Sequence, residues 1–542
     1  IDGREINAGP VTGTGTLNIF DFVDLIETGF ANPTQLMLDA SELGLDLRPS
    51  FESAFELTNV NLDGEWNFQS SELSFTEFAF NMENARVSSA GRIYLAEEMV
   101  HEEDLPFGVE LNANVSGALS VSTVLEYWPV NLGAGAREWL IENLHQGSVY
   151  EADLKLDIEP QSLRQGYLSN ENLQVDFLFR DGQFSFLSDM PPIVEGEGSA
   201  RLNGNSFSLD LERAMFSGWT LTRGVVNIPY FMPKGEDLYI EADGYGDISQ
   251  MLRTISDSRL QLENDYGLPI SDISGSGRAS FTMRRPALSD VSYDDTRFRV
   301  AGEVTEGKFV NLINDMTLVT NAADISVSND VIRISGYGEL DEAPVEFEWS
   351  DRFREDGPER SRLKASGYVG PDLLNRFGIA VRTYMTGDAL AEITASGPSA
   401  VDFQIVSVDL DLEETRLDIP ELNWTKRRGD ASSAQVSFRQ DTGTNLTRVA
   451  FDAEDLKFRG NLALTEEGRL DQLIVDQFYL EDQLDLAGEL RRTGPLALEL
   501  VVSGPFMNAE PLTAGLFSGE GGALCINDTS YCDRAEILRE KG

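Results

Sequence analysis

Side chains suited to catalysis are scarce in this chain. Of 542 residues only two are histidines, His101 and His145, and neither stands in a nucleophile or metal-ligand motif. We expect both imidazoles to be structural or exposed. The chain has 92 acidic residues, so a pair of carboxylates, the requirement for glycoside hydrolysis, is uninformative by itself. The sequence therefore predicts no active site, no cofactor and no enzyme activity.

Two motifs have the spacing of a phosphate or metal site, and each has a simpler explanation. Segment 302–309 matches the G-x-x-x-x-G-K skeleton of a phosphate loop, but Phe309 stands where a hydroxyl must meet magnesium. Asp409, Asp411 and Glu413 are spaced two apart and could share a calcium ion. Because the alternate positions are apolar, this row is typical of the wet face of a strand. We predict a chance match in the first case and no metal in the second.

The charge of the chain excludes one class of partner. With 42 basic and 92 acidic residues the formal charge is −50, which repels nucleic acid and anionic membrane surfaces. Solubility or a salty habitat explains such a charge better than a specific cationic partner does. Apolar residues make up 41% of the chain, enough to bury a core, so the charge does not indicate disorder. The sequence has no run of eighteen apolar residues, so it predicts no membrane-spanning helix.

The two ends of the chain leave questions open. Cys525 and Cys532 are close enough to form a disulfide in an oxidising compartment, and two free thiols in a tail are an equal alternative. A zinc site is not expected without further ligands nearby. The chain begins with Ile1, which predicts a processed or excised boundary.

Alternation of apolar and polar residues dominates the chain and predicts antiparallel strands, each with one apolar face. We expect turns at 181–182, 203–204 and 329–330, and a bulge near Glu77, where the alternation changes phase. If the apolar faces are continuous, they form the functional surface of the protein. Its candidate residues are Leu154, Leu156, Ile158, Leu173, Val175, Phe177, Phe179, Phe184, Phe186, Phe207, Leu209, Leu211, Leu238, Ile240, Val345, Phe347, Trp349, Leu410 and Leu412.

Four short helices are predicted between the strands. One covers residues 134–146 and ends at Gly147, and another lies near residues 22–29. A third begins at Asp247, with Gln250 three positions later as in a capping box. The fourth follows Gly370-Pro371.

The number of strands constrains the architecture. Roughly 30 to 35 strands exceed the limit of about ten for an open twisted sheet, so a flat sheet is excluded. The chain is predicted to be mostly β, either an elongated antiparallel sheet rolled into a trough or tandem β-sandwiches. We expect β segments at 1–120, 121–260, 261–370 and 371–510, a tail at 511–542, and an exposed linker at 350–362.

A resemblance comes from the region 123–160. Tyr127-Trp128-Pro129, then Arg137 and Trp139, then an alternating strand, resemble the central region of AsmA-like proteins of the YhdP type. The resemblance continues more loosely over most of the chain. It favours the trough over the sandwiches.

The resemblance implies a function without catalysis. Proteins of this family span the periplasm of Gram-negative bacteria and are implicated in moving phospholipid toward the outer membrane. The expected partners are phospholipids and the membranes or membrane proteins at either end, and an N-terminal inner-membrane anchor is expected to be missing here. The alternatives are a scaffold resembling the TamB branch, which assists outer-membrane protein assembly, and an enzyme built on sandwiches.

Overall fold

The protein is represented by a computed structural model that divides into two compact units. Unit 1 comprises residues 1–259 and 278–300, and unit 2 comprises residues 260–277 and 301–542. The structure describes residues 2–8, 11–20, 26–27, 30–48, 51–96, 105–130, 134–162, 166–185, 190–256, 270–288, 291–313, 315–377, 379, 381–400, 402–441, 444–464, 470–494, 497–507, 527–528 and 531–532.

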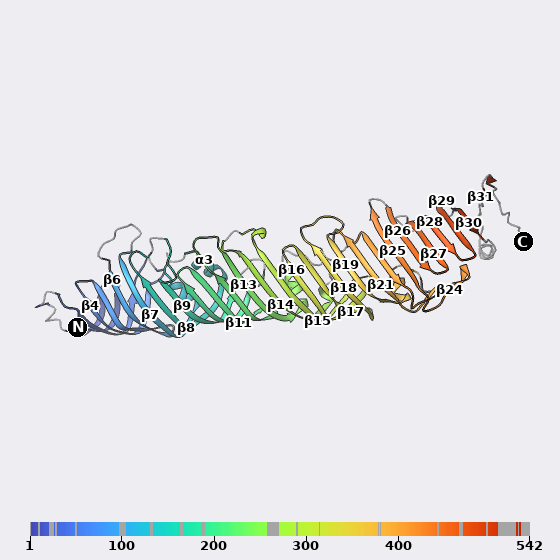
Figure 1. Ribbon diagram of the computed structural model, residues 1–542. Coiled ribbons are helices and arrows are strands. Elements are labelled where there is room, and N and C mark those ends of the chain that lie inside the picture. The colour runs from blue at the N-terminus through green and yellow to red at the C-terminus, as the bar shows by residue number, and fades with distance from the viewer. Residues whose placement is uncertain are drawn as a thin grey trace. The chain divides into compact units, whose positions relative to one another are not determined.

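The strands of unit 1 pair in chain order. Each strand from β1 to β13 is antiparallel to the next. Figure 1 labels β4, β6, β7, β8, β9, β11 and β13 of this series. The strands are β1 (Asp2–Ala8), β2 (Val11–Ile19), β3 (Thr34–Leu45), β4 (Phe55–Asn67), β5 (Glu72–Met82), β6 (Asn84–Leu95), β7 (Phe107–Ser120), β8 (Leu144–Ile158), β9 (Leu173–Phe184), β10 (Ile193–Asn203), β11 (Ser206–Phe216), β12 (Trp219–Ile228) and β13 (Asp237–Asp247). The helices are α2 (Val121–Glu126), α3 (Ala134–Asn143) and α4 (Ile248–Ser256).

Unit 2 repeats this arrangement. Its main strands are β16 (Met316–Ser328), β17 (Val331–Leu340), β18 (Ala343–Arg352), β19 (Ser361–Val369), β21 (Ala389–Gly397), β22 (Ile405–Asp411), β25 (Ser432–Asp441), β26 (Thr444–Ala453), β27 (Leu456–Leu464), β28 (Leu470–Leu480), β29 (Leu484–Gly494) and β30 (Ala497–Met507). Each is antiparallel to its neighbours in this series. Helix α6 (Pro371–Arg376) and a small sheet of β20 (Met385–Thr386), β23 (Arg416–Ile419) and β24 (Trp424–Lys426) are inserted between main strands.

A few shorter elements complete the chain. Strands β14 (Ile273–Pro286) and β15 (Arg297–Ile313) each contain residues of both units. Three single turns of 3₁₀-helix are η1 (Ile270–Asp272), η2 (Tyr293–Asp295) and η3 (Pro420–Leu422). The pair β31 (Asn527–Asp528) and β32 (Tyr531–Cys532) lies near the C-terminus.

The fold is therefore mostly β, as predicted, and the sandwich alternative is wrong. A sandwich requires two sheets facing each other in each unit. Strands β1 to β13 instead form a single ladder, and so do the main strands of unit 2. The segment boundaries predicted near 120 and 370 fall at α2 and α6, and pairing continues past both helices.

Two predicted turns are confirmed and one is wrong. Chain reversals occur at 204–205, between β10 and β11, and at 329–330, between β16 and β17. Asp181-Gly182 does not reverse the chain, because β9 continues through it to Phe184. Asp181 has φ 54° and the pairing with β10 shifts register beside it. An Asp-Gly pair accepts the left-handed backbone needed either for a hairpin or for a bulge, and here it makes a bulge.

The expected bulge at Glu77 is confirmed. The register between β5 and β6 shifts between Phe75 and Phe78, and two residues of β5, Thr76 and Glu77, oppose one residue of β6, Ala90. Partners on neighbouring strands share a face, so the extra residue returns Phe78 to the face that carries Phe75. An apparent change of phase in the sequence thus preserves one apolar face.

The helix predictions are partly right. Helix α4 is capped by Asp247, whose Oδ1 accepts hydrogen bonds from the backbone N–H of Ser249 and Gln250 at 2.7 and 3.3 Å. Helix α6 begins with proline at its first position. The helix expected over 134–146 ends earlier, at Asn143, and β8 starts at once, so Gly147 lies inside a strand. Most of the helix expected near residues 22–29 lies outside the described residues.

The linker predicted at 350–362 is a hairpin between β18 and β19. Asp351 and Ser361 are cross-strand partners and both are fully buried. Asp351 accepts a hydrogen bond of 3.1 Å from Arg360, and Ser361 accepts one of 3.0 Å from the Trp349 indole. The expected exposure is found in the loop itself, where residues 354–356 and 358–359 are exposed, whereas Asp351 and Ser361 at its base are buried.

Candidate functional site

The register brings the predicted surface residues of unit 1 onto one face. Leu156 pairs with Leu173, and Leu154 with Val175. The face continues through β10 to β13 by the pairs Val175–Leu202, Leu202–Phe207, Leu209–Val226 and Val226–Ile240. We call this surface the apolar face of unit 1. Except for Leu211, which is 6% exposed, the described candidates on it are half-buried.

An equivalent surface exists in unit 2. Phe347 pairs with Gly336 and Ala365, and Trp349 with Ile334 and Leu363. Farther along the ladder, Leu410 pairs with Ala391 and Ala434. Val345, Phe347, Trp349 and Leu410 therefore lie on one face, the apolar face of unit 2.

Glycines occupy many positions on the two apolar faces. A Cβ added at Gly198 would lie 2.1 Å from the Asp210 carbonyl oxygen of the next strand, and one at Gly336 would lie 2.7 Å from the Ala322 oxygen. Neither site has room for a side chain. The G-x-G pairs of the sequence therefore allow neighbouring backbones to approach closely, as at a bend in a sheet.

Residues 121–130 and 134–143, which contain α2 and α3 and which we call the α2–α3 cover, lie against the apolar face of unit 1. Helix α2 starts beside β8, where Val121 Cγ2 lies 3.4 Å from a Cβ built on Gly147. Tyr127, just after α2, stacks on Phe55 of β4 with ring centroids 4.7 Å apart. Phe55 in turn packs on the buried cluster that contains Leu43 and Leu57. The cover thus connects β8 with β4.

Polar contacts of Glu83 and Arg137 hold the cover in place. Glu83, in the turn between β5 and β6, accepts a hydrogen bond of 2.9 Å from the Ser120 backbone N–H at the start of α2, and this bond lowers the pKa of Glu83. Arg137 of α3 forms an ion pair with Glu52 and donates to the Leu125 carbonyl oxygen at 3.2 Å. The Arg137 side chain is only 13% exposed. Tyr127 and Arg137 of the motif in region 123–160 therefore have a structural role, since both hold the cover in place.

In unit 2 the insertions bury one end of the apolar face. Leu374 of α6, Leu417 of β23 and Trp424 of β24 pack on Leu410 and Leu412, which are 6% and 4% exposed. Predicted as surface for a ligand, these two leucines are instead core residues beneath α6 and the small sheet. Val345, Phe347 and Trp349 remain half-buried.

A buried lysine ties the small sheet to residues 412–415, the connection between β22 of the main sheet and β23. Lys426 is 3% exposed, and its ammonium donates to the carbonyl oxygens of Leu412, Glu413 and Thr415 at 2.6, 3.1 and 2.8 Å. Burial lowers the pKa of Lys426. The carbonyl oxygens occupy all three donors of the ammonium, so the group is structural.

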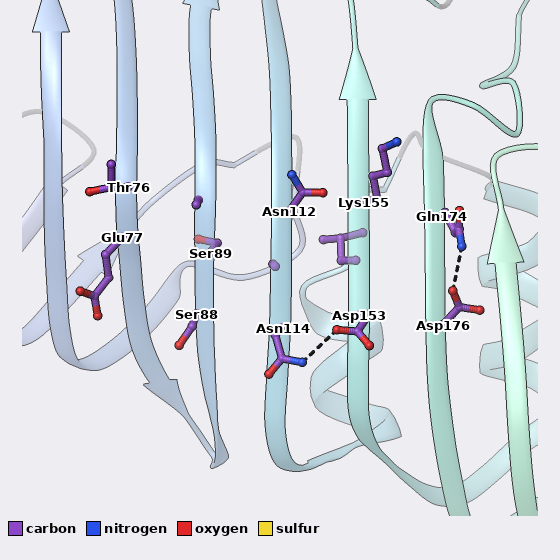
Figure 2. Close-up of a pocket in the computed structure, with 13 residues that line it drawn as sticks. Thr76, Glu77, Ser88, Ser89, Asn112, Asn114, Asp153, Lys155, Gln174 and Asp176 are labelled. Atoms are coloured by element: carbon purple, nitrogen blue, oxygen red, sulfur yellow. Dashed lines mark hydrogen bonds between the residues drawn. The ribbon is translucent and has the colours of Figure 1, made fainter.

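A separate hollow of about 580 Å³ lies over β5 to β9 and is lined mostly by residues that alternate along the strands with those of the apolar face, such as Asn112, Asn114 and Asp153. Figure 2 shows its polar lining, with hydrogen bonds of 2.9 Å from Asn114 to Asp153 and of 2.8 Å from Gln174 to Asp176. The polar groups of this surface would lose water beneath an acyl chain, which opposes the binding of an apolar ligand. The hollow is therefore not the site for an apolar ligand.

The remaining candidates for chemistry are accounted for by their positions. His145 is exposed and hydrogen-bonded to Ser185 at 2.9 Å. Segment 302–309 lies within strand β15, without the turn and helix of a phosphate loop. Asp409 is exposed and accepts a hydrogen bond from Gln435 at 2.6 Å. Within the described ranges, no group of three or more His, Cys, Asp or Glu residues could hold a metal ion.

Some predictions fall outside the described residues. Phe186, His101 and Cys525 are among them, so the pairing of Cys525 with Cys532 stays open. In the part of the chain that the structure covers, no helix combines the length and hydropathy needed to cross a membrane.

Comparison with known families identifies the chain. The family model described as YhdP protein matches residues 22–500, which is most of the sequence. The chain belongs to the YhdP family. The match confirms the resemblance seen at residues 123–160, and it includes both apolar faces and the α2–α3 cover. A search of curated proteins found no significant match.

Proposed function

We propose that this YhdP-family chain carries phospholipids along its apolar faces, without catalysis, in the periplasm of a Gram-negative bacterium. Such transport between the inner and outer membranes would support the lipid balance and barrier function of the outer membrane. The observation that carries the proposal is the continuity of one apolar face from strand to strand, with most of its predicted residues half-buried although no second sheet covers them among the described residues.

The energetics of lipid transfer support this use of the face. Moving two acyl chains through water exposes about thirty methylenes at roughly 0.8 kcal/mol each, of order 25 kcal/mol. A carrier must supply a long dry surface while the head group stays in water. An antiparallel sheet with one apolar face meets this requirement, because each added strand extends the surface by about 4.8 Å.

Native mass spectrometry with lipid extraction tests the proposal. We expect phospholipid to copurify with the chain, and Phe177→Asp, Phe207→Asp and Phe347→Asp each to reduce the bound amount several-fold. Ser208→Asp is the matched control, because it places the same carboxylate on the opposite face of β11. A folded, lipid-free wild-type protein would refute the proposal.

The same experiment separates the TamB-like alternative, a scaffold for outer-membrane protein assembly. Strand β30 favours it, since β29 is its only partner among the described pairings and Val501 and Phe506 are 51% and 50% exposed. An open strand edge can pair with another chain. Copurification of unfolded barrel proteins in place of lipid would support this alternative.

A further inference from the structure

The apolar face of unit 1 differs sharply between its two long rims. The first rim, where β7 ends and β8 begins, lies at the α2–α3 cover. There Leu119 is 9% and Ala85 5% exposed. At the second rim, where β6 ends and β7 begins, Phe107 is 40% and Leu95 55% exposed. Exposure therefore changes along β7, from Leu119 to Phe107, and along β6, from Ala85 to Leu95. All four residues lie on the same face, since Leu95 pairs with Phe107 and Ala85 with Gly117.

More of the first rim is buried and more of the second is exposed. Leu57 and Val60 of β4 are 2% and 0% exposed on the side of the cover. Beyond the other end of β4, Phe68 is 43% exposed and contacts Phe30, which is 45% exposed, with ring centroids 5.0 Å apart. We call the two sides the closed rim and the open rim.

We propose that the α2–α3 cover closes one rim of the apolar face, so that lipid binds to unit 1 in one orientation. Head groups lie at the open rim, and acyl chains point toward the closed rim. This inference rests on the proposed function and adds to it the direction in which the lipid lies. Arg137 is the positioning residue that holds the cover through Glu52.

The dimensions of the face fit an acyl chain as its occupant. From Phe107 to Ala113 β7 extends roughly 20 Å, at about 3.4 Å per residue. The acyl layer of one membrane leaflet is roughly 15 Å thick, half of a hydrocarbon core of about 30 Å. An acyl chain that starts near Phe107 therefore covers the half-buried residues Val109 and Leu111 and ends before the buried Leu119.

The chemistry of the closed rim excludes a head group there. A phosphate or ammonium at Leu57 or Leu119 would lose its water without gaining a partner, which is costly. The described turn between β4 and β5 at the open rim contains Gln69 and Ser70, which are polar and exposed, and Ser71, which is polar and half-buried. Head groups can remain hydrated beside it.

Photoaffinity labelling with diazirine phospholipids tests the orientation on the wild-type chain. One probe carries the diazirine in the head group and the other at the end of an acyl chain, and labelled peptides are mapped by mass spectrometry. We expect the head-group probe to label residues 66–73 and 105–109 several-fold more than residues 55–60 and 115–121. The acyl probe should give the reverse ratio.

A charge reversal tests the role of the cover. Arg137→Glu should release the cover and bring head-group labelling to residues 55–60, and adding Glu52→Arg should restore part of the wild-type ratio, because the ion pair returns while the hydrogen bond to the Leu125 carbonyl oxygen does not. Arg223→Glu is the matched control, since it breaks an exposed ion pair with Glu241 on the polar face of β12.

The outcomes separate the two proposals. Labelling without any difference between the rims, or with the reverse difference, would overturn the orientation while leaving lipid binding intact. Absence of labelling by both probes would overturn the proposed function. An unchanged ratio in a folded Arg137→Glu variant would overturn the role of Arg137.

Discussion

At the scale of single residues, the polar groups that matter most secure insertions to the sheet. Lys426 and Asp247 illustrate two modes. The Lys426 ammonium donates to three carbonyl oxygens, while the Asp247 carboxylate accepts from the first N–H groups of a helix. The Asp247 cap could be predicted from the sequence because it is local. The carbonyl partners of Lys426 lie 11 to 14 residues away, and no short pattern encodes that distance.

We expect Lys426→Met to destabilise unit 2 by about 2 kcal/mol. The substitution removes the donor for three carbonyl oxygens, two of them in buried contacts, and an unsatisfied buried acceptor costs about 1–3 kcal/mol. Hydrogen exchange of β23 and β24 measures the effect. Lys364→Met, at an exposed position of β19, should change little, and an equal effect of the two variants would contradict the structural role of Lys426.

Asp247→Ala should loosen α4 by about 1 kcal/mol, the usual cost of losing an N-cap, while Asp247→Asn should keep most of the cap. Its hydrogen bonds, first that from the Ser249 side chain, lower the pKa of Asp247 below its usual value of 3.8. Because folding lowers the pKa of Asp247, the stabilisation of α4 by this cap is complete above about pH 4. The stabilisation is lost as the pH falls through the folded-state pKa. Amide exchange of Ser249 and Gln250, measured against pH, should therefore show a difference between wild type and Asp247→Ala that shrinks in acid. A constant difference would argue against the ionised cap.

At the scale of elements, alternation predicted most strands, while the tertiary partners of the helices could not be predicted. Asp-Gly at 181–182 is compatible with either a turn or a bulge in the local sequence, and only its pairing with β8 and β10 decides for the bulge. The α2–α3 cover depends on Arg137 and Glu52, which are 85 residues apart. For the same reason the sequence did not reveal that Leu410 lies beneath α6 and the small sheet.

Alanine substitutions at two glycines on neighbouring strands should affect stability differently. In Gly198→Ala the new Cβ would lie 2.1 Å from the Asp210 oxygen, so the strands must move apart, at a cost of about 1–3 kcal/mol. In Gly182→Ala the nearest atom is 3.4 Å away, and the change should be within about 1 kcal/mol of neutral. Thermal unfolding of both variants checks this pair. A larger loss for Gly182→Ala would mean that close approach of backbones does not explain the glycine at 198.

At the scale of the whole molecule, a strongly acidic exterior accompanies the apolar faces. The formal charge of −50, read from the sequence, repels the phosphates of nucleic acid and so argues against a nucleic acid partner. It also bears on the lipid function, because a carrier must approach a donor membrane. Polar positions of the strands, such as Glu346 and Glu348 on either side of Phe347, place carboxylates on the face opposite to the apolar one. Lipid pickup should therefore depend on the charge of the donor surface.

Salt should accelerate lipid uptake from anionic vesicles and have little effect with zwitterionic ones. Raising the ionic strength from about 0.01 M to about 0.15 M shortens the Debye length from roughly 30 Å to roughly 8 Å, which screens repulsion between the chain and an anionic surface. The measurement is the initial rate of transfer of a fluorescent phospholipid from vesicles to the chain. Zwitterionic vesicles are the control for effects of salt on the apolar contact itself, which would change both rates equally. A rate from anionic vesicles that falls with salt would instead locate a basic contact surface on this acidic molecule, and the approach to the membrane would then be guided by attraction at that surface.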